Sequence, residues 1–179
     1  MKRYIVLLRG INISGKNKIT MSELKTEFAE HGFSDVVTYL NSGNIILSSV
    51  VDNEAVLSNE IVLLIKEKFN LNIPVFVVLQ KYLVEILNHA PAWWGDSNKE
   101  VYDNLIFMMS PLTYDEFYDA VGNPEAEYEK VYNFSNAVFW SFIRKDYQKT
   151  NWWSKTASSN ISGMITIRTA NTVRKIVNM

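Results

Sequence analysis

The predicted fold is built around the stretch Tyr4-Ile-Val-Leu-Leu-Arg-Gly-Ile-Asn-Ile-Ser-Gly-Lys-Asn-Lys18. Its first five residues are apolar, which is typical of a strand buried on both faces. Shortly after it, Thr20-Met-Ser-Glu23 has the pattern of a capping box and predicts a helix that begins near Met21. The stretch therefore predicts a strand, a polar loop from Arg9 to Lys18, and then a helix.

The following segments complete a β-α-β-β-α-β order. Two β-prone runs, 36–40 and 44–48, flank the turn Asn41-Ser42-Gly43 and indicate a hairpin. Apolar residues at helical spacing follow from about Asn53, and residues 74–79 form another apolar strand pattern. This is the order of the ferredoxin-like fold, so we predict an α+β protein with a ferredoxin-like N-terminal half.

We place the ferredoxin-like subdomain at residues 1–79 and a second, smaller α+β subdomain at 80–179. The second half contains further helix and strand patterns. Helices are predicted near 80–90, 113–121, 152–158 and from 171, and strands near 104–109, 127–132, 138–143 and 164–167. Because the sequence has no flexible linker and no internal sequence repeat, the boundary near residue 80 is soft and we expect one folding unit.

Composition excludes several classes of site. The chain has 179 residues and is 47% hydrophobic and 21% charged, as in ordinary globular proteins. Because it has no cysteine, it cannot form disulfides or thiolate metal ligands, and two histidines leave little room for a histidine site. Only five apolar residues separate Arg3 from Arg9, too few for a signal peptide, and no run is long enough to span a membrane. We expect a cytoplasmic protein without metal, cofactor or membrane partner.

Charge is distributed unevenly along the chain. Residues 1–25 contain six basic and one acidic side chain, a net charge of +5, and residues 144–179 contain seven and one, a net charge of +6. The segment between them carries −12. If the two basic segments lie together, they form a basic face on an acidic body, which suits an anionic partner.

The topology predicts a binding site at one edge of the first sheet. Its first two strands run parallel, so the loop 9–18 and the hairpin turn 41–44 lie at the same edge. We predict that this edge binds an anionic ligand: a nucleotide, a phosphorylated metabolite or a nucleic acid. In this hypothesis two cations supply charge, glycines admit the ligand to the backbone, and short polar side chains orient it. Arg168 and Thr172 join if the C-terminal segment folds back. The predicted ligand-binding residues are Arg9, Gly10, Asn12, Gly15, Lys16, Asn41, Ser42, Asn44, Arg168 and Thr172.

Two specific nucleotide-binding motifs fit poorly. Gly10 to Lys16 matches the phosphate-loop pattern G-x-x-x-x-G-K, but Asn17 stands where magnesium binding needs Ser or Thr, and the helix begins too late. An RNA-recognition module stacks bases on aromatic residues of its central strands, and here only Tyr4 is aromatic. The catalytic residues are unknown, and an enzyme acting on a phosphorylated or nucleotide substrate at the same edge is the alternative.

Other side chains favour structural roles. In the pairs Trp93-Trp94 and Trp152-Trp153 we expect one buried ring and one at the rim, although the pairs could also mark a protein-interaction module. Glu125, Glu127 and Glu129 would share one strand face, more simply as a solvated face than as a cation site. His31 precedes Gly32 at a predicted helix end, which indicates a capping role.

The same residues resemble a known family. The segments Leu7-Leu-Arg-Gly-Ile-Asn12, Gly15-Lys16-Asn17, Val37-Thr-Tyr39 and Ser42-Gly-Asn44 resemble the signature of the bacterial domain-of-unknown-function family 1697. At the C-terminal end, Thr166-Ile-Arg168 and Asn171-Thr-Val173 are similar to its second motif, but Thr169 and Ala170 replace an Asn-Trp pair. The resemblance implies a two-part α+β fold with a ferredoxin-like half, and it implies no activity.

Overall fold

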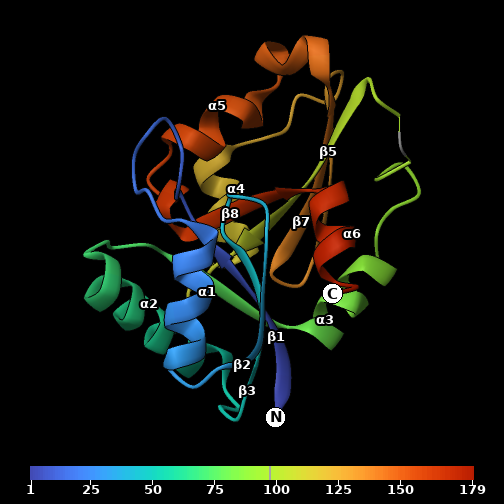
Figure 1. Cartoon of the computed structure of the whole chain (residues 1–179). Coiled ribbons are helices and arrows are strands. Elements are labelled where there is room, and N and C mark those ends of the chain that lie inside the picture. The colour runs from blue at the N-terminus through green and yellow to red at the C-terminus, as the bar shows by residue number, and fades with distance from the viewer. Residues whose placement is uncertain (97) are drawn as a thin grey trace. The chain divides into compact units, whose positions relative to one another are not determined.

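The computed structural model describes residues 1–96 and 98–179, and the chain divides into two compact units (Figure 1). The first unit consists of Met1–Val84 and Ile176–Met179, and the second of Glu85–Lys175. Each contains one four-stranded antiparallel sheet, which confirms the predicted α+β class. Within the described residues, every helix is too short or too polar to cross a membrane.

The first unit has the predicted ferredoxin-like arrangement. Its elements, with α3 at the boundary between the units, are β1 (Lys2–Leu8), α1 (Met21–Glu30), β2 (Ser34–Tyr39), β3 (Asn44–Ser49), α2 (Glu54–Phe69), β4 (Val75–Leu79) and α3 (Gln80–Asn88). The strand order is β2-β3-β1-β4. Since β3 is antiparallel to both β1 and β2, these two strands run parallel and end at the same edge, as expected.

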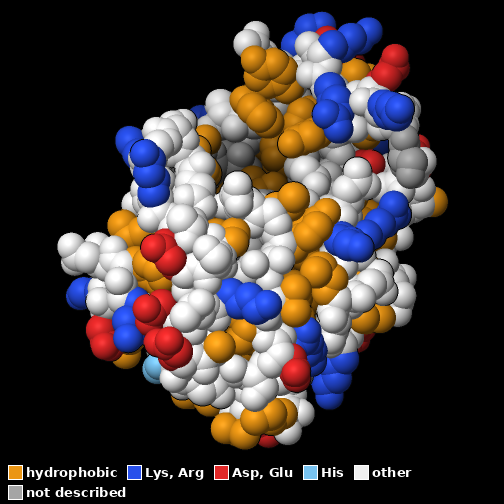
Figure 2. Space-filling model, viewed as in Figure 1, with side chains coloured by type: hydrophobic (Ala, Val, Ile, Leu, Met, Phe, Trp, Pro, Cys, Tyr) orange, Lys and Arg blue, Asp and Glu red, His pale blue; other side chains and the backbone are white. Residues whose placement is uncertain are grey.

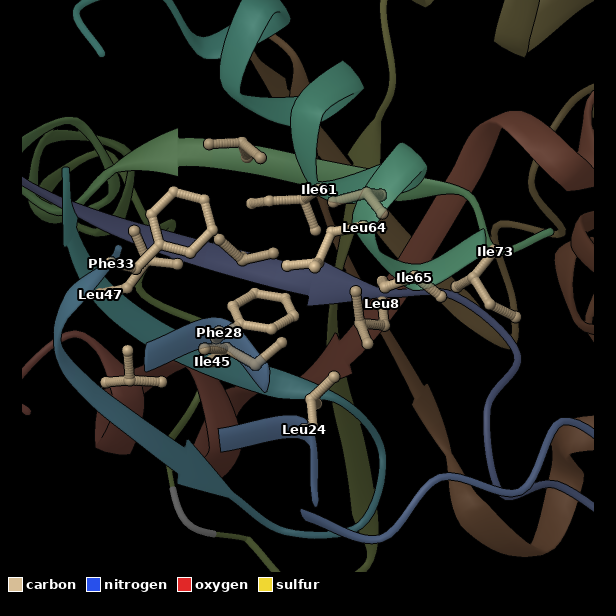
Figure 3. Packing of buried hydrophobic residues seen from close by; sticks show 14 of the residues in the cluster. Leu8, Leu24, Phe28, Phe33, Ile45, Leu47, Ile61, Leu64, Ile65 and Ile73 are labelled. Carbon is tan, nitrogen blue, oxygen red and sulfur yellow. The ribbon is translucent and has the colours of Figure 1, made fainter. Parts of the chain in front are cut away.

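The core of the first unit lies between its sheet and the helices α1 and α2. Figure 3 shows Phe28 of α1 and Ile61 of α2 beside Leu8 of β1 within one buried cluster. Burial of each such side chain contributes about 1.5–3 kcal/mol. On the opposite face of β1, Ile5 and Leu7 are also completely buried. Neither face of this strand is therefore open to stacked bases.

Helix α1 begins and ends where the sequence predicts. The Thr20 hydroxyl accepts a hydrogen bond from the backbone N–H of Glu23 at 3.2 Å and donates to the Glu23 carboxylate at 2.6 Å. At the other end Gly32 has φ +106°, and His31 Nε2 lies 2.9 Å from a carboxylate oxygen of Glu60 on α2. His31 thus has the structural role that its position indicates.

The second unit repeats the topology of the first. Its elements are β5 (Val101–Met108), α4 (Tyr114–Val121), β6 (Glu129–Phe134), β7 (Ala137–Ile143), the 3-10 helix η1 (Arg144–Lys149), α5 (Asn151–Ser158), the 3-10 helix η2 (Ser162–Met164), β8 (Ile165–Thr169) and α6 (Ala170–Ile176). The strand order β6-β7-β5-β8 corresponds to β2-β3-β1-β4. The sequence shows no internal repeat because the two units share a backbone arrangement and not a pattern of residues.

Backbone hydrogen bonds at the end of the first strand of each unit make this correspondence specific. In each unit the last residue of the first strand donates its backbone N–H to a carbonyl in the hairpin turn. The next residue donates its N–H to the carbonyl of the residue that directly precedes the fourth strand. The bonds are Leu8 N to Gly43 O (2.8 Å), Met108 N to Asn136 O (2.9 Å), Arg9 N to Pro74 O (3.0 Å) and Met109 N to Met164 O (2.8 Å). Both units therefore join their loops to the sheet in the same way.

Aromatic rings dominate the core of the second unit. Trp152 is fully buried and meets Phe117 edge to face at 5.1 Å, whereas its neighbour Trp153 is 44% exposed. Trp94 is buried and Trp93 is half-buried. Each tryptophan pair therefore has the expected division between a core ring and a rim ring.

Glu129 departs from the expectation of a solvated acidic face. It is only 3% exposed, and its carboxylate accepts hydrogen bonds from Trp140 Nε1 at 2.9 Å and from the backbone N–H groups of Asn151 and Glu125, both at 2.8 Å. Because β6 begins at Glu129, Glu125 and Glu127 precede the strand and do not share its alternation. The buried carboxylate lies at the N-terminus of α5, where the helix dipole favours an anion.

Candidate functional site

The loop of residues 9–20 connects β1 to α1 and has an unusual backbone. Five of its residues, Gly10, Asn12, Ser14, Gly15 and Asn17, have φ between +47° and +76°. Glycine and asparagine tolerate this left-handed conformation best, which explains their frequency here. Such backbone persists only where surrounding contacts hold it.

Asn12 supplies several of those contacts. Its side-chain amide donates to the carbonyls of Ile19 at 2.8 Å and Asn41 at 2.9 Å, and its Oδ1 accepts from the Ile19 N–H at 2.9 Å. Ile11, which precedes Asn12, and Ile19, to which the Asn12 side chain is hydrogen-bonded, are both buried. Asn12 therefore connects the loop to the hairpin turn, and the hydrogen bonds of its amide maintain the shape of the site.

The hairpin turn is held equally firmly. Asn44 is completely buried, and its amide donates to Tyr39 O at 2.8 Å and Ser42 Oγ at 3.0 Å. Gly43 has φ +77°, and a Cβ at this position would lie 2.7 Å from Leu8 Cβ. The turn thus needs glycine both for its conformation and for the close approach of β1.

Loop and turn together border an open depression of about 600 Å³. Its lining, which defines the loop–hairpin depression, consists of Asn12, Gly15, Lys18, Ile19, Thr20, Met21, Glu23 and Asn41. The predicted convergence of the two segments is therefore found, together with the first turn of α1. Lys18 and Glu23 were not among the predicted residues, although the capping box already placed Glu23 at the helix start.

The predicted cations occupy different positions. Lys16 is exposed and lies in a tight turn whose backbone N–H donates to Ile13 O at 2.9 Å, while Arg9 is half-buried at the end of β1. Lys16 does not line the depression. Because Lys16 precedes α1 by several residues, its placement also differs from that of a phosphate-loop lysine, which lies at the helix start.

Arg168 and Thr172 belong to the second unit, on β8 and α6. The Arg168 guanidinium donates to Thr166 Oγ1 at 2.8 Å and to Ile167 O at 2.9 Å, and burial lowers its pKa to about 10. The Thr172 hydroxyl lies 3.0 Å from that of Thr169. Their participation in the predicted site of the first unit stays a prediction.

The family described as "Protein of unknown function (DUF1697)" matches residues 1–139. The chain belongs to the DUF1697 family. The solved structure of the conserved bacterial protein SP0830 from Streptococcus pneumoniae is similar to it, with 30% sequence identity and a TM-score of 0.86, over 99% of this chain and 97% of that chain. None of the curated proteins matches the sequence.

The family match includes the loop–hairpin depression but ends before the C-terminal motif at 166–173. In this DUF1697 protein the polar side chains of the depression are one cation, one carboxylate, one hydroxyl and two amides: Lys18, Glu23, Thr20, Asn12 and Asn41. Across residues 1–96 and 98–179, no three histidine, aspartate or glutamate side chains gather as metal ligands.

Proposed function

We propose that the loop–hairpin depression binds a phosphate-bearing ligand: a nucleotide, a phosphorylated metabolite or a nucleic acid. The observation that carries the proposal is the comparison with the second unit. There the equivalent connection between β5 and α4 needs only residues 109–113, whereas the first unit uses residues 9–20. Since the topology does not require the longer loop, a binding role is the best explanation for it.

The charge of the loop supports an anionic ligand. Residues 9–20 contain Arg9, Lys16 and Lys18 and no acidic side chain. In the described part of the chain, neither lysine forms an ion pair. Glu23 is the acidic residue of the lining, and its carboxylate accepts the Thr20 hydroxyl at the start of α1. Left-handed residues within turns can direct neighbouring backbone N–H groups toward an anion, and this loop contains five such residues.

Two apolar side chains favour an organic ligand over a free inorganic anion. Ile13 is 60% exposed and Leu40 is 53% exposed. Each is next in sequence to a residue of the lining, Asn12 and Asn41. Leu40 also has φ +56°, an uncommon conformation for leucine. These side chains offer a nonpolar surface to a base or sugar beside the cationic loop.

Thermal unfolding with ligands tests the proposal. Wild type is compared with Lys16→Ala/Lys18→Ala in the presence of nucleotides, sugar phosphates and short oligonucleotides at low and moderate salt. A ligand at 100 times its dissociation constant stabilises the folded state by about 2.7 kcal/mol, which raises Tm visibly. We expect this shift in wild type and its loss in the double variant.

A charge-matched control is Lys2→Ala/Lys81→Ala. Both lysines are exposed, and they lie at the opposite end of the sheet, next to Ser49 and after Leu79. This control should keep the ligand-induced shift. Equal shifts in both double variants, or no shift with any anion in wild type, would contradict the proposal.

A further inference from the structure

A second elaboration of the shared topology lies in the second unit. Its connection between β7 and α5 comprises residues 144–150 and includes η1, whereas the first unit makes the equivalent connection with residues 50–53. Beside this segment lies an open hollow of about 280 Å³. Its lining, which defines the aromatic hollow, is Tyr102, Phe142, Arg144, Tyr147 and Trp153.

Trp153 provides an uncovered ring that is nevertheless fixed in place. Its side chain is 44% exposed and meets Phe142 at 5.7 Å and Tyr147 at 4.9 Å between ring centroids, both edge to face. Its backbone N–H donates to Thr150 Oγ1 at 3.3 Å in the cap of α5. The ring is therefore preorganised, and a planar group can pack against it at little entropic cost.

Arg144 adds a cation to the same hollow. Its guanidinium carbon lies 4.5 Å from the ring centroid of Tyr102, and its Nε donates to Val101 O at 3.3 Å. Among residues 1–96 and 98–179, no carboxylate forms an ion pair with it. The stacked guanidinium thus keeps donors for an external anion.

A second cation lies beside the hollow. No acidic residue belongs to its lining, and η1 also carries the exposed Lys145. Asp146, the acidic residue of η1, is paired with Lys149 at 2.9 Å. Figure 2 shows hydrophobic side chains gathered at the top of the view, over α5 and the segment before it, with Lys and Arg side chains beside them.

We propose that the aromatic hollow binds single-stranded nucleic acid. A base stacks on Trp153, and the adjoining phosphates contact Arg144 and Lys145. Exposed aromatic rings beside cations are the recurring device for binding unpaired strands, whose bases are free to stack. A cationic ligand is disfavoured by Arg144, and a duplex keeps its bases stacked inside. This proposal concerns the second unit and does not depend on the loop–hairpin depression.

Fluorescence anisotropy of labelled 15-nucleotide homopolymers of DNA and RNA tests it, with wild type, Trp153→Ala, Trp153→Phe and Arg144→Ala. Stacking of one base predicts that Trp153→Ala weakens binding about five- to 150-fold, and Trp153→Phe should restore most of it. Removing one phosphate contact should reduce the slope of log affinity against log salt by about 0.7 in Arg144→Ala.

Tyr132→Ala is the matched aromatic control, because Tyr132 is also 44% exposed but lies on β6 and does not line the hollow. Its affinity should equal that of wild type. Circular dichroism confirms that each variant is folded. Oligonucleotide binding by Lys16→Ala/Lys18→Ala distinguishes the aromatic hollow from the loop–hairpin depression.

Several results would overturn the proposal. The first two are that wild type binds no oligonucleotide at low salt, and that wild type and Trp153→Ala bind with equal affinity. Two others are that a mononucleotide binds as tightly as an oligonucleotide, and that Trp153→Ala changes from a dimer to a monomer. The last result would assign the hollow to a contact between two copies of this chain. Loss of binding in Lys16→Ala/Lys18→Ala alone would assign the strand to the first unit and would also overturn it.

Discussion

The two units have one topology but differ in where each carries additional chain. The first extends the connection from β1 to α1, and the second extends the connection from β7 to α5. In a ferredoxin-like unit these connections lie at opposite ends of the sheet, because β7 is antiparallel to β5 as β3 is to β1. Both extensions are cationic. The comparison of the two units thus shows which connections can be short in this topology and which are longer than the topology requires.

The interiors differ as well. The buried charged residues of the described chain, Asp103, Glu129 and Arg168, all lie in the second unit. Buried polar residues of the first unit are neutral, such as Asn44 and Ser48. The second unit consequently depends on satisfied buried charges, whereas the first depends on apolar packing and close backbone contacts. Glu129→Ala and Gly43→Ala test this difference, and Glu116→Ala tests the cap of α4 in the second unit.

Glu129→Ala should have the largest effect. It leaves the buried Trp140 Nε1 and the Asn151 N–H without their acceptor. Each buried donor left unpaired costs about 1–3 kcal/mol, so we expect a loss of about 3 kcal/mol or more in urea unfolding. The exposed Glu127→Ala is the control and should stay within about 0.5 kcal/mol of wild type. Amide exchange that accelerates equally in both units would refute the division of roles.

Gly43→Ala should be the next most damaging. The new Cβ would lie 2.7 Å from Leu8 Cβ and 2.9 Å from Ile11 Cδ1, at φ +77°. We expect a loss of about 2 kcal/mol or more. Gly10→Ala isolates the conformational part, because Gly10 has φ +71° and no atom within 4 Å of a built Cβ. It should cost about 1 kcal/mol. Equal losses in the two variants would show that the close approach of β1 is unimportant.

Glu116→Ala should have the smallest effect, and the effect should depend on pH. The Glu116 carboxylate accepts the backbone N–H of Thr113 at 2.9 Å, which lowers its pKa from 4.5. A lowered folded-state pKa stabilises the fold above the unfolded value, and this stability is lost as pH falls through the folded value. The decrease in Tm should therefore be visible at pH 7 and vanish in strong acid. A decrease that is constant with pH would contradict the capping explanation.

Much of the first unit could be predicted from sequence, because local signals agree there. The apolar run before Arg9, the Thr20 cap and the Asn41-Ser42-Gly43 turn each specify an element, and together they specify one topology. The convergence of loop and turn followed from that topology. The position of Lys18 in the lining of the depression was not predicted, because the direction of a loop side chain depends on backbone angles that residue types do not determine.

The second unit shows what sequence patterns could not supply. Glu129 looked like one of three alternating surface carboxylates, and its burial depends on Trp140 and α5, which are distant in sequence. The aromatic hollow likewise assembles residues from four elements, β5, β7, η1 and α5. Repetition of the topology was invisible because the shared contacts are backbone hydrogen bonds, which almost any side chain permits.

The assignment of residues 176–179 to the first unit has a consequence for synthesis on the ribosome. Ile176 is completely buried, Gln80 Nε2 donates to Val177 O at 2.8 Å, and Arg3 reaches Met179 O at 3.4 Å. Domains generally fold in the order in which they emerge. Here the first unit to emerge lacks part of its interior until residues 176–179 have been translated, so the second unit can be complete before the first.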